Sequence, residues 1–191
     1  KRLAGDTRYE TNLEILDEAK ASKEDLLACT GEGFADSLSA SAVGKPILLV
    51  DNRGLTTAQQ TYLDKANVQE IYLIGGADVV SDKVGKELQS YDKDSKTERI
   101  AGDNRYKTSV AVAKAFFPDK CDTVVLAYGM KFPDGLAGGP LAISMGSPLL
   151  LVEDTAYADA KAYGSSVGIS KLAVLGGTDV ISDATAESIL Q

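Results

Sequence analysis

Three aspartates occupy positions at which a chain of alternating strands and helices could assemble a reaction centre. Asp36, Asp51 and Asp78 each follow a short apolar run of the kind that forms a buried strand. If their carboxylates converged, they could bind Mg²⁺ and support phosphoryl chemistry. Helix caps and turns explain the same positions without a metal, and capping is also the simpler interpretation of Asp134. We therefore predict no metal site and no cofactor.

A glycine-containing loop and the absence of histidine bear on other kinds of catalysis. The segment Gly31–Asp36 begins like a dinucleotide-binding loop, but Asp36 takes the place of the third glycine, so we do not expect nucleotide binding. The chain has no histidine, which removes the commonest general base, triad partner and zinc ligand. No serine or cysteine has an evident base, and we predict no catalytic residue.

Two Arg–Tyr pairs, Arg8-Tyr9 and Arg105-Tyr106, are the strongest candidates for ligand contact. An arginine in the first turn of a helix opposes the helix dipole, so its recurrence indicates a partner. That partner could be structural, either Asp6 or a carboxylate of a neighbouring unit. The alternative is an arginine fork that, beside an aromatic ring, grips phosphate or sugar groups of a polymer.

Charge and composition narrow the range of partners. Lys plus Arg total 20 and Asp plus Glu total 28, which gives a net charge of −8 without any basic cluster. This balance argues against nucleic acid and anionic lipid, and no apolar run approaches the ~18 residues of a membrane span. Cys29 and Cys121 are too few for a disulfide scaffold, and two buried thiols are expected rather than a bridge.

One sequence unit occurs twice in the chain. The segment RLAGDTRYET, from Arg2, returns as RIAGDNRYKT, from Arg99, with seven of ten positions identical. Three further blocks recur in the same order, namely FADSL and FPDGL, PILLV and PLLLV, and GGADVVSD and GGTDVISD. Ordered recurrence of this kind indicates a tandem duplication. We predict a boundary near Thr97, with domains at 1–97 and 98–191.

Each predicted domain alternates helical and strand patterns. Thr7 and Glu10 form a capping box, which predicts a helix over 8–20. Further helices are expected over 35–44, 57–66 and 134–146 and from Ser81, and buried strands over 26–30, 47–50, 71–74 and 123–127. This alternation predicts an α/β fold of two tandem Rossmann-like or Toprim-like units, each a small parallel sheet between helices.

The carboxyl ends of parallel strands are where ligands bind in such sheets. The glycine pairs that follow the third strand pattern of each unit are expected to be tight backbone passages, either beside such a site or beside a packed helix. The candidate ligand-binding residues are Arg8, Tyr9, Asp36, Gly75, Gly76, Arg105, Tyr106, Asp134, Gly176 and Gly177.

The junction between the repeats suggests how units associate. Residues 97–101 could add a fourth strand to the first sheet, whereas nothing equivalent follows the second repeat in this sequence. Lys1–Ala4 would be the corresponding strand for a preceding or partner unit. We therefore expect either a third repeat or self-association.

The duplicated blocks resemble the cell wall binding repeat 2 family of surface and surface-layer proteins of Gram-positive bacteria. The resemblance covers essentially the whole chain as two repeats, whereas modules of that family usually come in threes. It implies export to the cell wall and non-covalent attachment to a wall polysaccharide, often an anionic, teichoic-acid-like polymer. Among the candidate residues, the resemblance implies polysaccharide binding first for Arg8 and Arg105.

These observations predict a non-catalytic, extracellular module that anchors a protein to the cell wall. Weak polymer contacts in the two repeats would combine through avidity. Because the chain is acidic, binding must depend on local Arg and Lys side chains or on a bridging cation. The alternatives are a spacer or self-assembly module of a surface protein and a metal-dependent phosphohydrolase that uses Asp36, Asp51 and Asp78.

Overall fold

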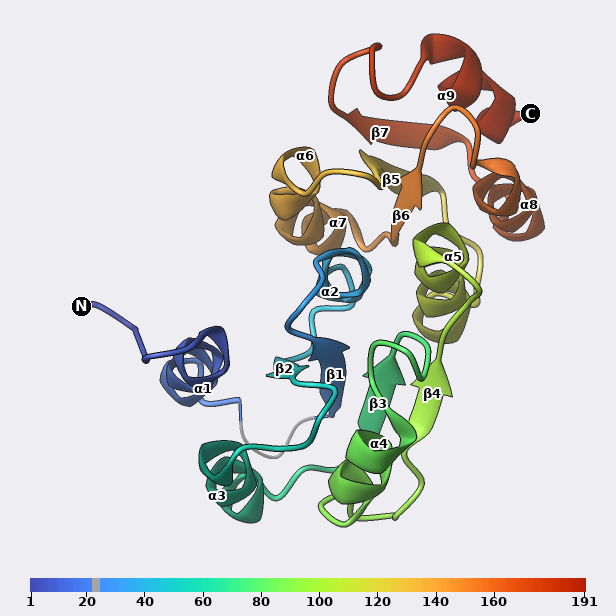
Figure 1. Cartoon of the computed structure of the whole chain (residues 1–191). Helices are drawn as coiled ribbons and strands as arrows, with labels where there is room; N and C mark the ends of the chain where they lie inside the picture. Colours follow the sequence, from blue (N-terminus) through green and yellow to red (C-terminus); the bar gives the residue numbers. More distant parts are fainter. Residues whose placement is uncertain (22–24) are drawn as a thin grey trace. The chain divides into compact units, whose positions relative to one another are not determined.

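The chain is divided into two units by its internal contacts. The computed structural model describes residues 1–21 and 25–191, and Figure 1 labels the helices and strands. Unit 1 comprises Lys1–Phe34 and Lys45–Ile100, and unit 2 comprises Ala35–Gly44 and Ala101–Gln191. No helix in these described ranges has both the length and the apolar character needed to cross a bilayer.

The sheet of unit 1 has four parallel strands in the order β2-β1-β3-β4. The parallel pairing confirms the predicted α/β class, and β4 is the expected fourth strand of the first sheet. The strand bounds are β1 Leu26–Thr30, β2 Ile47–Val50, β3 Ile71–Ile74 and β4 Glu98–Ile100.

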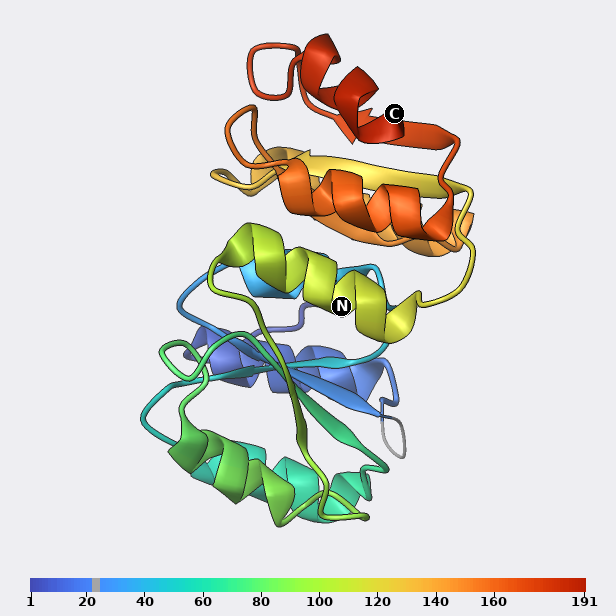
Figure 2. The same ribbon diagram turned by 90° about the vertical axis from the view of Figure 1, so that its right-hand side faces the viewer.

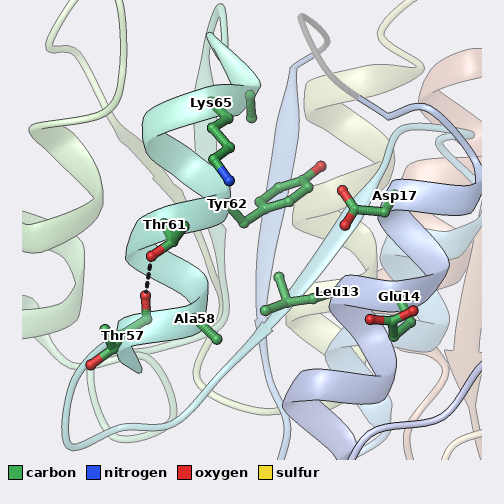
Figure 3. Close-up of a pocket in the computed structure, with 9 residues that line it drawn as sticks. Leu13, Glu14, Asp17, Thr57, Ala58, Thr61, Tyr62 and Lys65 are labelled. Carbon is green, nitrogen blue, oxygen red and sulfur yellow. Dashed lines mark hydrogen bonds between the residues drawn. The ribbon is translucent and has the colours of Figure 1, made fainter.

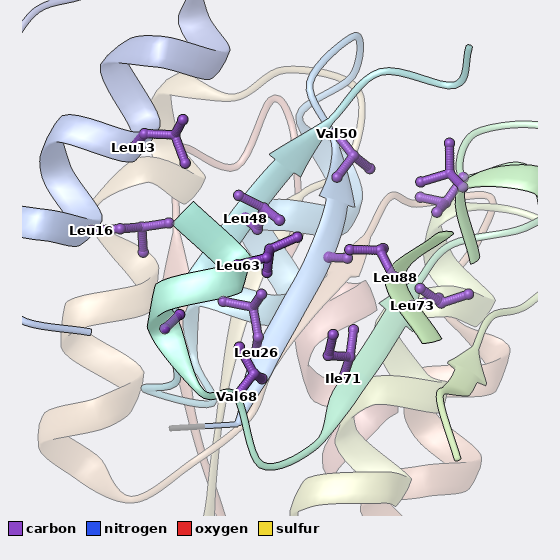
Figure 4. Packing of buried hydrophobic residues seen from close by; sticks show 14 residues of the cluster. Leu13, Leu16, Leu26, Leu48, Val50, Leu63, Val68, Ile71, Leu73 and Leu88 are labelled. Atoms are coloured by element: carbon purple, nitrogen blue, oxygen red, sulfur yellow. The ribbon is translucent and has the colours of Figure 1, made fainter. Parts of the chain in front are cut away.

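Three helices pack on one face of this sheet, and α3 and α4 run along the same side of it in Figure 2. Their bounds are α1 Arg8–Glu18, α3 Thr57–Ala66 and α4 Asp82–Gln89. Alternate strand residues face these helices because side chains of a strand point in turn to opposite faces. The core in Figure 4 includes Leu13, Leu16, Leu26, Leu48, Val50, Leu63, Ile71, Leu73 and Leu88. Burying each such side chain stabilises the folded state by about 1.5–3 kcal/mol. A shift of one residue in the strand register would expose these side chains, so their burial fixes the register.

Side-chain caps begin the helices of unit 1 where the sequence predicts them. The Thr7 side chain accepts a hydrogen bond from the Glu10 N–H, and the Glu10 side chain accepts one from the Thr7 N–H, which confirms the capping box. Thr56 and Gln59 form a second capping box at α3, and Ser81 caps α4. These residues satisfy backbone groups that a helix end otherwise leaves unpaired.

The amide group of Asn12 covers the outer edge of β2. Its Nδ2 donates to the Ile47 carbonyl at 2.9 Å, and its Oδ1 accepts from the Leu49 N–H at 2.9 Å. Asn12 therefore provides the donor and the acceptor that a neighbouring strand would provide. In unit 2 the Ser109 hydroxyl accepts from the Leu151 N–H at 3.1 Å, which is half of the same arrangement.

Unit 2 repeats this plan around a three-stranded parallel sheet in the order β6-β5-β7. Its strands are β5 Thr123–Tyr128, β6 Leu149–Val152 and β7 Lys171–Leu175. One face is packed by α5 Arg105–Phe116, α8 Ala158–Val167 and α9 Asp183–Leu190, which contribute to a single apolar cluster. Short helices, α6 Pro133–Leu136 and α7 Gly138–Met145, pack against β5.

Helix α2 (Ala35–Ser41) belongs to unit 2 by its contacts, although its sequence lies in the first repeat. It packs against α5, α7 and β6. The contact-based units therefore do not coincide with the sequence repeats, and the boundary near Thr97 remains a proposal about the duplication. Both cysteines are buried thiols, Cys29 in β1 and Cys121 just before β5.

The segment 134–146 is broken into two helices, not one continuous helix as predicted. Ala137 ends α6 and precedes the first residue of α7. A side chain at Gly138 would collide with Leu149 and Leu175, and one at Gly139 would collide with Ser41. The two glycines allow the backbone to lie close to the sheet and to α2, and the helix is interrupted just before them.

Candidate functional site at the strand ends

The guanidinium of Arg8 contacts the carboxyl end of β1. Its Nη1 donates a hydrogen bond to the Gly31 carbonyl, and Arg105 repeats the contact with the Gly129 carbonyl at 2.7 Å. The partner in this contact is a backbone carbonyl, whereas the structural alternatives considered were Asp6 and a carboxylate of a neighbouring unit. Each arginine ties the first turn of a helix to the end of the first strand of its repeat.

The aromatic ring of Tyr9 occupies the space that a side chain at Gly31 would need. A Cβ atom there would lie 2.5 Å from Cε1 of Tyr9. The same clash recurs between Gly129 and Tyr106. These two glycines are therefore required by ring packing, which gives the glycine after the first strand a structural role unrelated to nucleotide phosphates.

Carboxylates surround the hydroxyl groups of these tyrosines. The Tyr9 hydroxyl donates to Oε1 of Glu32 at 2.8 Å. Burial, together with Glu32 and Asp51, raises the pKa of Tyr9 to about 12. Burial and the neighbouring Glu153 raise the pKa of Tyr106 likewise to about 12. Both hydroxyl groups are therefore protonated at physiological pH. The Tyr9 hydroxyl donates to Glu32, whereas the buried Tyr106 hydroxyl has no hydrogen-bond partner among the described residues.

Asp51 and Arg53 form a bidentate ion pair at the carboxyl end of β2. Arg53 Nε and Nη2 lie 2.8 and 2.6 Å from the two carboxylate oxygens of Asp51. These hydrogen bonds lower the pKa of Asp51 to about 2. The Asp51 side chain is largely buried whereas that of Arg53 is exposed, so the guanidinium faces solvent. Sequence reasoning missed Arg53 because its counterpart in the second repeat is Thr155.

The turn after the second strand fixes the correspondence between the repeats. Asp51 bridges to Gly54 and Glu153 bridges to Ala156, so Asp51 corresponds to Glu153. The following residues, Asn52 and Asp154, then share one role at the start of the last helix of their repeat. Asn52 Oδ1 accepts from the Ser81 N–H at 2.5 Å, and Asp154 Oδ1 accepts from the Ser182 N–H at 2.9 Å.

The glycine pairs form the same turn after β3 and β7. Gly75 and Gly176 have φ angles of +112° and +110°, a region that residues with a side chain rarely adopt. The carbonyl groups of Gly76 and Gly177 then accept hydrogen bonds that close each turn. A side chain at Gly176 would also meet the Asp134 carboxylate, so Gly176 and Asp134 lie together at the sheet edge.

Asp36 and Asp134 occupy the second positions of α2 and α6, respectively. Asp134 is not the N-cap residue that the sequence analysis expected, because Phe132 holds that position and provides no side-chain cap. A carboxylate in the first turn still interacts favourably with the helix dipole. Asp36 belongs to unit 2, whereas Asp51 and Asp78 belong to unit 1. Among the described residues, no group of three or more acidic or cysteine side chains could hold a metal ion.

A pocket of about 470 Å³ opens beside Tyr9 and the Asp51–Arg53 pair. Lys83 and Glu87 of α4 also line it, and Lys83 Nζ donates to the Arg53 carbonyl at 2.7 Å. The pocket therefore combines an aromatic ring, two cations and several carboxylates. Such a set suits a polar ligand that carries hydroxyl and anionic groups.

A second pocket, of about 390 Å³, lies between α1 and α3 and is lined by Leu13, Tyr62 and Lys65 among others (Figure 3). Tyr62 donates to the Ala21 carbonyl at 3.2 Å. Its counterpart Tyr163 donates to a carbonyl in the same way but is fully buried. This groove is therefore a local feature of unit 1, whereas the tyrosine at the strand ends is a feature of both repeats.

Comparison with known sequences identifies the family. The model of cell wall binding domain 2 matches residues 2–85 and 99–186. In Bacillus subtilis (strain 168), the chain is 29% identical to N-acetylmuramoyl-L-alanine amidase LytC over 96% of its own length and 37% of that protein. It is 31% identical to the amidase enhancer of the same organism, over 80% of the chain and 21% of the relative.

Solved structures share the fold. Cwp8 from Clostridium difficile superposes with a TM-score of 0.88 at 26% identity, over 99% of this chain and 33% of that one. Cwp6 from the same organism gives a TM-score of 0.83 at 23% identity, over the whole chain and 32% of its own length. The chain thus spans little more than a third, or less, of these four proteins. Two matched segments that cover nearly all of the sequence show that the chain belongs to the cell wall binding domain 2 family.

Proposed function

We propose that this chain is a non-catalytic module that holds a protein on the outside of the cell by binding a secondary wall polysaccharide. The observation that carries the proposal is the family match over both repeats. The proposed ligand is an anionic, teichoic-acid-like polymer. Membership of the family supports the wall-binding role. A polymer that carries hydroxyl groups and charges fits the polar pocket at the strand ends.

The contact residues that we propose lie at the carboxyl ends of the strands. In unit 1 the Tyr9 edge and the exposed guanidinium of Arg53 line one pocket with Lys83. Arg53 can bind a phosphate or carboxylate of the polymer with its remaining donors, because a guanidinium has five N–H groups. Arg8 contributes less, because part of its guanidinium is committed to the Gly31 carbonyl.

In unit 2 we propose a weaker site around Tyr106 and Glu153. Thr155 replaces the arginine and hydrogen-bonds to Glu153 at 3.1 Å, and Ala184 takes the place of Lys83. This edge therefore lacks both cations of unit 1 and is expected to bind sugar hydroxyl groups. Two unequal sites on one chain still gain avidity when they engage one polymer.

Co-sedimentation with purified walls of Bacillus subtilis strain 168 tests the proposal. The chain should sediment with intact walls, and it should stay in solution after acid extraction has removed the accessory polymers. Equal sedimentation before and after extraction would contradict polymer binding. Release of soluble wall fragments by the chain alone would contradict a non-catalytic role.

A further inference from the structure

The groove between α1 and α3 is a cavity that the proposed wall-binding role does not use. Its volume of about 390 Å³ lies within the range of pockets that hold small ligands. All of its lining residues belong to these two helices of unit 1, so the groove is complete within that unit.

The corresponding helices of unit 2, α5 and α8, close this space. Tyr163 of α8 is only 1% exposed, and its hydroxyl donates to the Phe117 carbonyl. Its counterpart Tyr62 is only partly buried, because its hydroxyl donates to the Ala21 carbonyl and its ring stays in the groove (Figure 3). The fold can therefore be built with this space filled, and the open groove is a property of unit 1.

The charges of the groove are also a property of unit 1. Glu14 and Asp17 project from α1, and Lys65 lies on α3. The residues at the three corresponding positions of the second repeat are Ala111, Lys114 and Ser166. The second repeat thus reverses one charge and lacks the other two, so the packing of the two helices does not require this set of charges.

The acidic and basic side chains stand on opposite walls of the groove. Figure 3 shows Asp17 directed from α1 toward the ring of Tyr62, and Lys65 beside the same ring on α3. Burial and the nearby Asp17 raise the pKa of Tyr62, as a carboxylate close to that hydroxyl should. Within the described part of the chain, none of the three charged side chains forms an ion pair. The groove thus has one anionic and one cationic wall.

The floor between these walls is apolar. Leu13 and Ala66 are 8% and 3% exposed, and the ring of Tyr62 and the methyl group of Ala58 extend the same surface. An apolar side chain of a ligand is stabilised there because it leaves water. The face of an aromatic ring beside a carboxylate also attracts an ammonium group.

We propose that the α1–α3 groove binds a short peptide with free ends and an apolar side chain. Its ammonium group would lie at Asp17 and Glu14, its carboxylate at Lys65, and its side chain on the floor around Leu13. Two extended residues span about 7 Å, a length that suits groups on facing helices whose axes lie about 8–10 Å apart. Opposite charges at its two ends distinguish such a ligand from an anionic polymer.

The proposal goes beyond wall binding and does not depend on it. The groove shares no lining residue with the pocket at the strand ends, which holds Arg53 and Lys83. A peptide in the groove therefore leaves retention on walls unchanged, and either function can fail while the other holds.

Titration with the dipeptide alanyl-leucine, followed by the amide chemical shifts of the 20.1 kDa chain, tests the proposal. At about pH 6 both ends of the peptide are charged, since the α-carboxyl and α-amino groups have pKa values of about 3.5 and 8. Shifts should change with concentration at α1 and α3 and not around Tyr9 and Arg53. N-acetyl-alanyl-leucine and alanyl-leucine amide each lack one charge and should bind roughly two- to fivefold more weakly.

Variants assign each end of the peptide to its wall. When Glu14→Gln is combined with Asp17→Asn, acetylation should no longer weaken binding, and in Lys65→Gln amidation should no longer do so. Asp64→Asn removes a carboxylate from the exposed surface of α3 outside the groove, and as the control it should keep both effects. Ala58→Phe should fill the groove and abolish binding, with retention on walls unchanged.

The absence of concentration-dependent shifts at α1 and α3 would overturn the proposal, and so would equal binding of the three peptides. Effects of acetylation and amidation that persist in the groove variants would do the same. Circular dichroism shows whether each variant is folded. Because Ala58 and the three charged residues are exposed or line the groove, replacing them leaves the core of unit 1 in place.

Discussion

The Tyr9 hydroxyl donates a 2.8 Å hydrogen bond to the carboxylate of Glu32, which follows β1. This bond joins the first turn of α1 to the loop at the carboxyl end of β1. With the Arg8 contact to the Gly31 carbonyl, it fixes the edge where the proposed ligand binds. The arginine contact is common to both repeats and therefore has a structural role, whereas the bond from tyrosine to glutamate is a feature of unit 1.

Gly31→Ala is expected to lower the free energy of unfolding by about 1–3 kcal/mol, the usual cost of overpacking. The added Cβ would collide with the Tyr9 ring, which cannot withdraw without breaking its bond to Glu32. Gly33→Ala is the matched control, because its Cβ would meet only Thr30 Cγ2 at an ordinary 3.6 Å. Urea unfolding compares the two, and equal effects would contradict the ring-packing explanation.

Stability in acid should depend on Asp51. Its hydrogen bonds to Arg53 lower its pKa to about 2, below the usual value of 3.8. Between these two values the unfolded chain binds more protons than the folded one, so stability falls as the pH falls. Asp51→Asn should make the unfolding free energy less dependent on pH between about 4 and 2. Urea titrations at several pH values measure this slope, and parallel slopes for both proteins would contradict it.

Repetition in the sequence predicts most of the fold and only part of the site. The capping box at Thr7, the buried strands and the fourth strand at Glu98–Ile100 follow from local patterns, because each depends on neighbouring residues. The break at Ala137 was missed, since the close approach of Gly138 to Leu149 arises only when the chain folds.

The site residues show which contacts a search for sequence repeats does not find. Arg8 and Tyr9 were found because they recur, but their partners, Gly31 and Glu32, lie on another element. Arg53 was missed because it occurs in one repeat alone. A search for duplicated residues identifies what the fold needs in both copies. It overlooks a side chain that gives one copy its own binding properties.

The edge of β2 offers a test of how each unit is stabilised. Asn12→Leu removes two hydrogen bonds to β2 and leaves the Leu49 N–H without a partner. The free energy of unfolding should fall by about 1–3 kcal/mol. Ser109→Ala in unit 2 removes one bond to β6 and one to the Tyr106 carbonyl of its own helix, and it should have a smaller effect because it leaves one strand group without a partner instead of two. Urea unfolding midpoints decide the comparison, and a larger loss for Ser109→Ala would show that the amide does not protect this edge.

Wall retention should depend on the two cations of the pocket in unit 1. Arg53→Gln and Lys83→Gln each remove one charge near Tyr9 and should weaken binding to intact walls by roughly two- to fivefold, the range for one charge contact at an exposed site. The double variant should also show less dependence on salt, because fewer charge contacts are screened.

Lys65→Gln is the matched control for these variants, because it removes an equal charge from α3 in the groove lined by Tyr62. Its retention on walls should equal that of the unaltered chain. Since Asp51 would lose its ion pair in Arg53→Gln, the thermal unfolding midpoint must be compared before binding is measured. If Lys65→Gln lowers retention as much as Arg53→Gln does, the ligand binds by overall charge or in the α1–α3 groove, and the strand-end site is wrong.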